Sequence, residues 1–116
     1  MEKFMLLVRE DLKKLKEITD LDRDDGVKEM MEWVDGLGEN FAGGEPLLPK
    51  GSYVTKDGIV SDGPFIEAKE GISGYIMINA ENLAQAAAIA QSCPILQRGE
   101  LEMEVRPILI SDFPNE

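Results

Sequence analysis

The chain has 116 residues, of which 43% are apolar and 30% are charged, and this composition predicts one soluble globular domain. Its formal net charge of −11 excludes nucleic acid as an expected partner, because that binding relies on basic patches, and no apolar run is long enough for a membrane span or a secretory leader. Histidine is absent, which excludes His-based triads, imidazole proton relays and most zinc sites, and we predict no metal and no cofactor.

The first part of the chain predicts a buried strand followed by helical segments. Phe4–Val8 (FMLLV) is an unbroken apolar run, typical of a strand that is central in its sheet or covered on both faces. The charged stretch 11–25 predicts a short exposed helix and a connector. A second helix is expected from about Val27, where apolar residues recur at helical spacing. These residues are Val27, Met30, Met31, Val34, Leu37 and Phe41.

The ends of this second helix also have sequence signals. Asp24 and Asp25 lie where a cap and the helix dipole favour carboxylates, and Gly43-Gly44 predicts the end of the helix. Trp33 lies at the edge of the apolar stripe and is expected to be a half-buried packing residue, with a dimer contact as the alternative.

The middle of the chain predicts a hairpin after a loop at Pro46 to Pro49. The two runs Tyr53 to Lys56 and Ile59-Val60 flank Asp57-Gly58, a pair that suits the positive φ angles of a type I′ turn.

The last third predicts a strand, a helix and a strand. Gly74 to Asn79 (GYIMIN) is nearly all apolar, and the alanine-rich Glu81 to Ser92 predicts a helix close to the sheet, capped near Asn79 and ended by Pro94. Glu100 to Arg106 (ELEMEVR) alternates apolar and charged residues, which indicates a strand with one face on the core.

The order of these elements predicts an α+β fold of the ferredoxin-like βαββαβ pattern with an antiparallel sheet. In that pattern the first and third strands are central, and the fourth is at an edge. The two apolar runs would take the central positions, and the charged alternating strand would take the edge.

One segment resembles a known family. Asp62-Gly63-Pro64-Phe65, followed by Glu67, Lys69 and Glu70, is similar to the DGPF signature of the YCII-related (DGPF-domain) proteins. The resemblance extends along the chain in KFMLLV near the start, in the Gly-x-x-Leu-x-Pro-like stretch at Gly44 to Pro49, and in Glu104-Val105-Arg106-Pro107.

This resemblance implies a single YCII-related domain over residues 1–116 and a fold of the dimeric α/β-barrel type, in which two sheets pair face to face. It also implies a homodimer and a bacterial protein. Some relatives resemble small enzymes with a His-Asp pair in the cleft, a pair that this chain cannot form because it has no histidine. Other relatives are associated with sigma-factor-like transcription proteins, whereas the acidic charge of this chain argues against direct DNA contact.

The candidate site combines the DGPF segment with the polar side of the last strand. We expect a small ligand, anionic ligands included, to bind in a cleft between sheet and loop, with Arg106 as an anion clamp. Three carboxylates at alternate strand positions, Glu100, Glu102 and Glu104, would lie about 7 Å apart and raise one another's pKa if water were excluded. The predicted ligand-binding residues are Asp62, Phe65, Glu67, Lys69, Glu104 and Arg106.

Alternatives remain open at this point. In a purely structural interpretation Asp62 makes a turn, Gly63 tolerates the backbone before Pro64, and Phe65 anchors the loop in the core. The chain could instead be a protein-interaction or regulatory module without a ligand pocket. A third possibility is a histidine-independent enzyme that uses Asp62, Glu67 or Glu104 as acid or base.

Cysteine usage bears on localisation. Cys93 is the only cysteine, so an internal disulfide is excluded and a reducing, cytoplasmic compartment is expected. We interpret it as a packing residue at a helix C-terminus, where the helix dipole opposes a thiolate.

Overall fold

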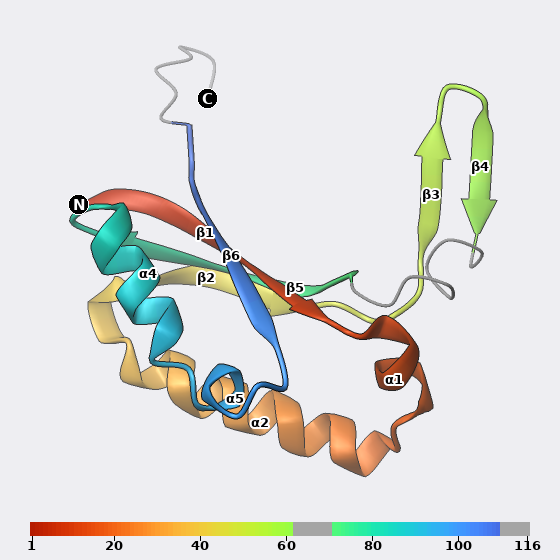
Figure 1. Ribbon diagram of the computed structural model, residues 1–116, viewed down its shortest axis with the longest axis horizontal. Coiled ribbons are helices and arrows are strands. Elements are labelled where there is room, and N and C mark those ends of the chain that lie inside the picture. The colour runs from red at the N-terminus through yellow and green to blue at the C-terminus, as the bar shows by residue number, and fades with distance from the viewer. Residues whose placement is uncertain (62–70, 110–116) are drawn as a thin grey trace.

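The computed structural model describes residues 1–61 and 71–109, and its centre is an antiparallel four-stranded sheet in the order β2-β5-β1-β6 (Figure 1). The strands of this sheet are β1 (Glu2–Glu10), β2 (Phe41–Pro46), β5 (Gly71–Ala80) and β6 (Glu102–Pro107). The predicted central positions are confirmed, because β1 contains FMLLV and β5 contains GYIMIN. The charged strand β6 lies at an edge, as expected.

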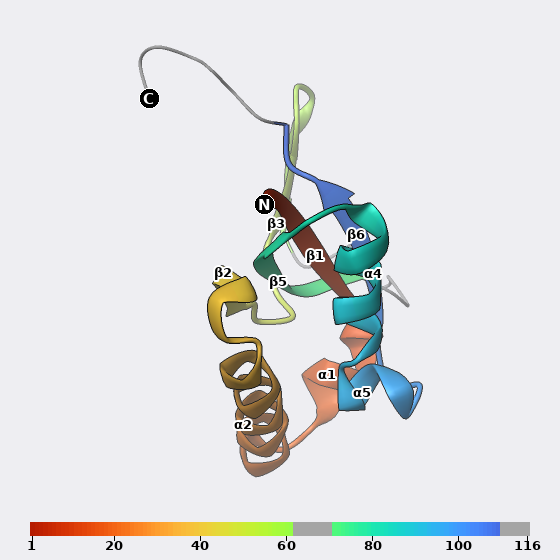
Figure 2. The same cartoon turned by 90° about the vertical axis from the view of Figure 1, so that its left-hand side faces the viewer.

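The helices lie on one side of the sheet, and a separate hairpin rises on the other side (Figures 1 and 2). Strands β3 (Ser52–Thr55) and β4 (Gly58–Ser61) form this two-stranded sheet of their own. The helical segments are α1 (Leu12–Glu17), α2 (Asp20–Gly36), the 3-10 helix η1 (Gly38–Asn40), α4 (Leu83–Gln91) and α5 (Pro94–Gln97). No helix of the described residues is both long and apolar enough to cross a membrane.

Alternation along the central strands separates a core face from an open face. On β1, Phe4, Leu6 and Val8 are buried under the helices, while the residues between them are only partly buried. On β5, Ile76, Ile78 and Ala80 are buried in the same way. Within residues 1–61 and 71–109, helices cover one face of the sheet and leave the other face open, which is common for antiparallel sheets.

The alanine-rich helix packs closely, as its composition predicts. Ala86 and Ala90 of α4 are buried in the core, and small side chains allow this close approach to the sheet. The N-cap is Asn82, whose side chain accepts a hydrogen bond of 2.8 Å from the Gln85 amide. Cys93 is fully buried just after this helix, in agreement with a packing role.

The second helix begins earlier than the sequence suggests. Its N-cap is Thr19, whose hydroxyl accepts a hydrogen bond of 3.1 Å from the Asp22 amide, and the prediction of a cap at Asp24 and Asp25 is wrong. The acidic residues at 20–25 suit the helix because carboxylates are favourable in its first turns. Trp33 is a packing residue, and its indole N–H donates a 3.0 Å hydrogen bond to the Ser92 hydroxyl beyond α4.

The second strand of the sheet is also not where we expected it. The prediction assigned the role to the hairpin, whereas the structure gives it to β2, which contains Phe41 and the glycine pair Gly43-Gly44. Gly44 has φ +153°, and a Cβ there would lie 2.9 Å from the Ile76 Cα and closer still to the Tyr75 carbonyl oxygen. Both glycines belong to β2 instead of ending a helix, and Gly44 allows the close approach of β2 to β5.

The predicted hairpin is confirmed, with its turn one residue earlier. Thr55 pairs with Gly58, so Lys56 and Asp57 form the two-residue loop. The Asp57 amide donates a 3.2 Å hydrogen bond to the Thr55 hydroxyl, and the positive φ falls on Gly58, which begins β4. The fold is therefore ferredoxin-like, with this hairpin inserted between its second and third strands.

Candidate functional site

The open face of the sheet carries two rows of side chains that cross all four strands. The first row is Glu45, Tyr75, Leu7 and Glu104, from β2 to β6. The second row is Gly43, Met77, Met5 and Arg106. Directly paired residues lie on the same face of a sheet, so the residues of each row are neighbours. Each row has apolar residues at its centre, on β5 and β1, and a charged residue at the β6 edge.

Two arginines lie on either side of one carboxylate at this edge. Arg9 Nη1 is 3.8 Å from Glu104 Oε1, and Arg106 Nη1 is 3.4 Å from Glu104 Oε2. The side chain of Arg106 is 67% exposed, so this ion pair contributes little to stability. Each guanidinium has five N–H donors, and these long contacts use few of them. Both arginines can therefore donate to an anion in solution.

The structure brings together two of the residues that were predicted to form the site. Glu104 and Arg106 lie side by side on the open face, and Arg106 donates a 3.4 Å hydrogen bond to the Glu104 carboxylate. The remaining predicted residues, Asp62, Phe65, Glu67 and Lys69, lie outside the described residues.

The prediction of three carboxylates along one strand face is wrong. Glu100 lies before the start of β6, and its carboxylate accepts a 3.0 Å hydrogen bond from Arg98. Only Glu102 and Glu104 belong to the strand. The residues that the structure describes contain no group of three His, Cys, Asp or Glu side chains that could hold a metal ion.

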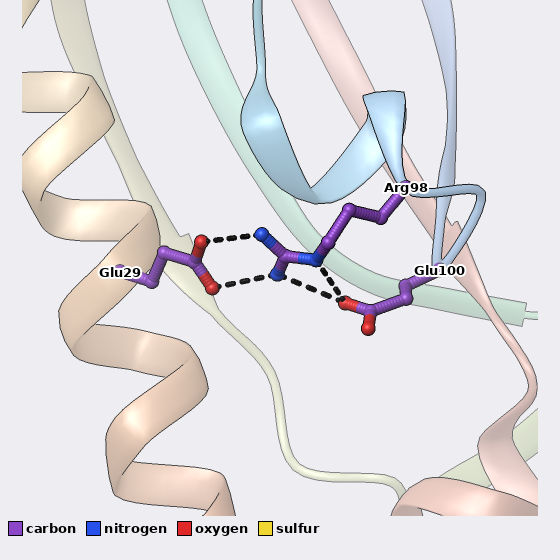
Figure 3. Close-up of polar contacts among 3 residues, drawn as sticks. All are labelled: Glu29, Arg98 and Glu100. Atoms are coloured by element: carbon purple, nitrogen blue, oxygen red, sulfur yellow. Dashed lines mark hydrogen bonds and ion pairs between the residues drawn. The ribbon is translucent and has the colours of Figure 1, made fainter.

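Arg98 forms an ion-pair cluster with Glu29 and Glu100 (Figure 3). It makes two hydrogen bonds of 2.7 Å with the Glu29 carboxylate of α2, in addition to its contact with Glu100. This bidentate geometry connects α2 to the turn between α5 and β6. The hydrogen bonds from Arg98 lower the pKa of Glu29 below its ordinary value of 4.5.

This cluster predicts a specific loss of stability in acid. A carboxyl group whose pKa is lowered by folding stabilises the protein above its ordinary pKa, and that contribution disappears as the pH falls through the lower folded pKa. Glu29→Gln is expected to lower the melting temperature at neutral pH. The difference from wild type should shrink as the pH falls below 4.5. Thermal denaturation followed by circular dichroism, from neutral pH to below 4.5, measures this difference in melting temperature.

The control is Glu32→Gln, which removes one charge from the same helix at an exposed position outside the ion pairs described here. Its difference from wild type should be small at every pH. A Glu29→Gln effect that stays constant into acid would show that the loss of charge pairing is not its cause.

Sequence reasoning missed two polar contacts of the sheet. Arg9 continues the alternation of Met5 and Leu7, but its proximity to Glu104 depends on the register of β1 and β6. The buried Ser73 hydroxyl donates a hydrogen bond to the Glu10 carboxylate beside a bulge in the β1–β5 pairing. The alternation indicates the face on which Arg9 lies, and no local signal marks its contact with Glu104 or the hydrogen bond of Ser73 to Glu10.

Two hollows of the described surface lie elsewhere. One, of about 370 Å³, follows the exposed side of α2 near Met31, and the other, of about 280 Å³, lies between Arg23 and Pro49. Neither is lined by Glu104 or Arg106.

Comparisons with known proteins agree with this architecture. No match was found among curated proteins. Among solved structures, 5-chloro-2-hydroxyhydroquinone dehydrochlorinase (TftG) from Burkholderia phenoliruptrix AC1100, in complex with 2,5-dihydroxybenzoquinone, is similar with a TM-score of 0.58. The match covers 94% of this chain and 95% of that chain at 13% identity, a level at which the likeness shows the fold alone. The fold is the α+β, dimeric α/β-barrel type. The family model of the YCII-related domain matches residues 3–109, and the chain therefore belongs to the YCII-related family.

Proposed function

We propose that this protein binds a small molecule, preferably an anion, in a cleft between the open face of the sheet and the DGPF segment at Asp62 to Phe65. The observation that carries the proposal is the pair of arginines, Arg9 and Arg106, around one carboxylate at the edge of an apolar surface. Ligand sites commonly combine an apolar lining with a few polar groups that fix orientation.

The floor of the proposed cleft is the centre of the two rows. Met5, Leu7, Tyr75 and Met77 are half-buried there. A flat ligand could lie on this surface while an acidic group accepts hydrogen bonds from Arg106. The solved structure of similar fold supports this arrangement, because that protein holds 2,5-dihydroxybenzoquinone, a small oxygen-rich ring.

We further propose that the protein is a homodimer in which two open faces meet. Apolar side chains at the centre of both rows are only half covered in one chain, and a second sheet would remove them from water. A partner sheet would also supply a wall for the cleft. We propose a single domain over residues 1–116 and a cytoplasmic, bacterial protein.

A thermal-shift screen tests the ligand proposal. Small carboxylates, phosphates, dihydroxyquinones and divalent metals are tested with wild type and with Arg106→Ala. A ligand at 100 times its dissociation constant adds about 2.7 kcal/mol to the free energy of unfolding, which raises the melting temperature of such a domain by several degrees. The shift should be lost in Arg106→Ala, because the clamp is removed.

The matched control is Arg23→Ala, which removes the same charge from α2, where Arg23 forms a local ion pair with Asp20. It should keep the shift. A screen without any shift, or an equal shift in Arg106→Ala, would contradict the proposal and favour an interaction module that works without a pocket. A confirmed ligand would make Glu104 the first residue to test for acid or base chemistry.

A further inference from the structure

The β3–β4 hairpin exposes apolar side chains on both of its faces. Tyr53 pairs with Val60 and Val54 pairs with Ile59, and successive pairs point to opposite faces. These four side chains are between 50% and 70% exposed. The hairpin therefore has two apolar faces and no polar one.

Little of the described chain supports this hairpin. It forms a sheet of its own and is not hydrogen-bonded to the four-stranded sheet. Among the described elements, no helix or strand packs extensively against it, and it projects from the body of the molecule (Figures 1 and 2). An isolated two-stranded hairpin is marginally stable in water, and exposed apolar patches of this kind mark interaction sites.

We propose that the hairpin is an arm that packs against a second copy of this chain. The inference rests on the proposed homodimer and adds a contact to it. The hairpin rises on the open side of the sheet, opposite α2 and α5 (Figures 1 and 2). Strands of four residues span about 13 Å, whereas two sheets packed face to face lie about 10 Å apart. The arm therefore reaches the level of the partner sheet and passes beside it.

The chain also carries exposed apolar side chains at one end of the sheet, which can receive this arm. We call this group the receiving surface, and it consists of Met1, Phe41, Leu83 and Leu109. Phe41 pairs with Ile78, and Glu2 pairs with Ala80, just before Leu83 begins α4. Leu109 follows Ile108, whose amide donates a hydrogen bond to the Lys3 carbonyl at the same end. The hairpin is connected at the other end, after Pro46, which pairs with Gly74.

A twofold axis that runs across the strands brings these two surfaces together. Such an axis places the arm end of each sheet over the receiving end of its partner, and the same contact forms twice. The pairing covers both apolar surfaces at once. An axis along the strands would instead place arm against arm and leave the receiving surface in water.

Sedimentation of single variants tests the arm. Ile59→Lys places a charge on one apolar face of the hairpin and should raise the dimer dissociation constant at least about tenfold, because a charge is buried in the contact. Met31→Lys makes a comparable change at an exposed position on α2, outside both surfaces, and should leave the constant unchanged. Circular dichroism verifies that both variants are folded.

Cross-linking tests the geometry. Val54→Cys and Leu83→Cys are prepared separately, and Cys93 is buried and does not compete. A short bismaleimide should link the two variants when they are mixed and link neither variant alone. Links within the Val54→Cys sample alone would indicate arm against arm and overturn the proposal.

The outcomes separate the two proposals. A monomeric wild type would overturn both the homodimer and the arm. A dimer whose dissociation constant is unaffected by Ile59→Lys, with no mixed cross-link, would overturn the arm alone and leave the pairing of the sheets in place.

Discussion

Gly44→Ala is expected to lower the free energy of unfolding by about 3–5 kcal/mol, the sum of backbone strain and overpacking. At φ +153° an L side chain is strained, and the new Cβ would lie 2.9 Å from the Ile76 Cα and closer still to the Tyr75 carbonyl oxygen. These atoms belong to the backbone of β5 and cannot rotate away. To relieve the clash, β2 must move from its neighbour and break their pairing. Urea denaturation of the purified variant measures the loss.

The control is Gly26→Ala in α2, where a new Cβ meets no atom within 4 Å. Alanine is the better helix former, and this variant should be more stable than wild type by up to about 1 kcal/mol. A Gly44→Ala protein as stable as wild type would show that β2 does not approach β5 as closely as described.

Phe4→Ala is the second large effect, with an expected cost of about 3–5 kcal/mol. Phe4 is 1% exposed and is among the largest fully buried side chains of the described residues. It lies on a central strand with β5 on one side and β6 on the other, so the surroundings cannot collapse easily into the space. Urea denaturation should show a lower midpoint with an unchanged slope.

Met5→Ala is the comparison, because Met5 is the next residue along β1 and lies on the open face. Its direct cost in one chain should be smaller than that of Phe4→Ala. If two open faces meet, its cost should grow with protein concentration, because dimer stability depends on concentration. Equal costs for the two variants, independent of concentration, would contradict the assignment of a core face and an open face.

Most of the elements were predictable from local patterns. FMLLV and GYIMIN are strong strand signals because continuous apolar runs suit central strands. The alternation from Leu101 to Arg106 indicates an edge strand. The alanines of α4 and the Asp57-Gly58 pair were equally informative. In each case the signal lies within a few residues of the element that it predicts.

The second strand was not predictable, for a physical reason. Phe41–Pro46 contains two glycines and a proline, which have low strand propensity. It is a strand because Tyr75 and Ile76 of β5 offer a surface that only glycine can approach so closely. This requirement comes from Tyr75, which lies 31 residues after Gly44 in the sequence, and no local pattern contains it.

The candidate site was predictable in part. The position of Glu104 and Arg106 on one strand face follows from alternation alone. The contribution of Arg9 needs the pairing of Leu7 with Glu104, which depends on strand order and register. Glu100 lies before β6 and accepts a hydrogen bond from Arg98, which also donates to Glu29 of α2. Glu29 is far from Glu100 in the sequence, so no local pattern shows this arrangement.

The central position of β1 has a consequence for biosynthesis. β1 leaves the ribosome before both of the strands that it needs as neighbours, and these are encoded at residues 71–80 and 102–107. At about 5–20 residues per second, the FMLLV segment waits roughly 5–20 s for its last neighbour. Until β6 has been synthesised, at least one backbone edge of β1 is unpaired and part of its apolar surface is uncovered. Nascent chains of this protein should therefore be substrates for ribosome-associated chaperones until β6 has been synthesised, and stalled chains that end before Glu102 should aggregate.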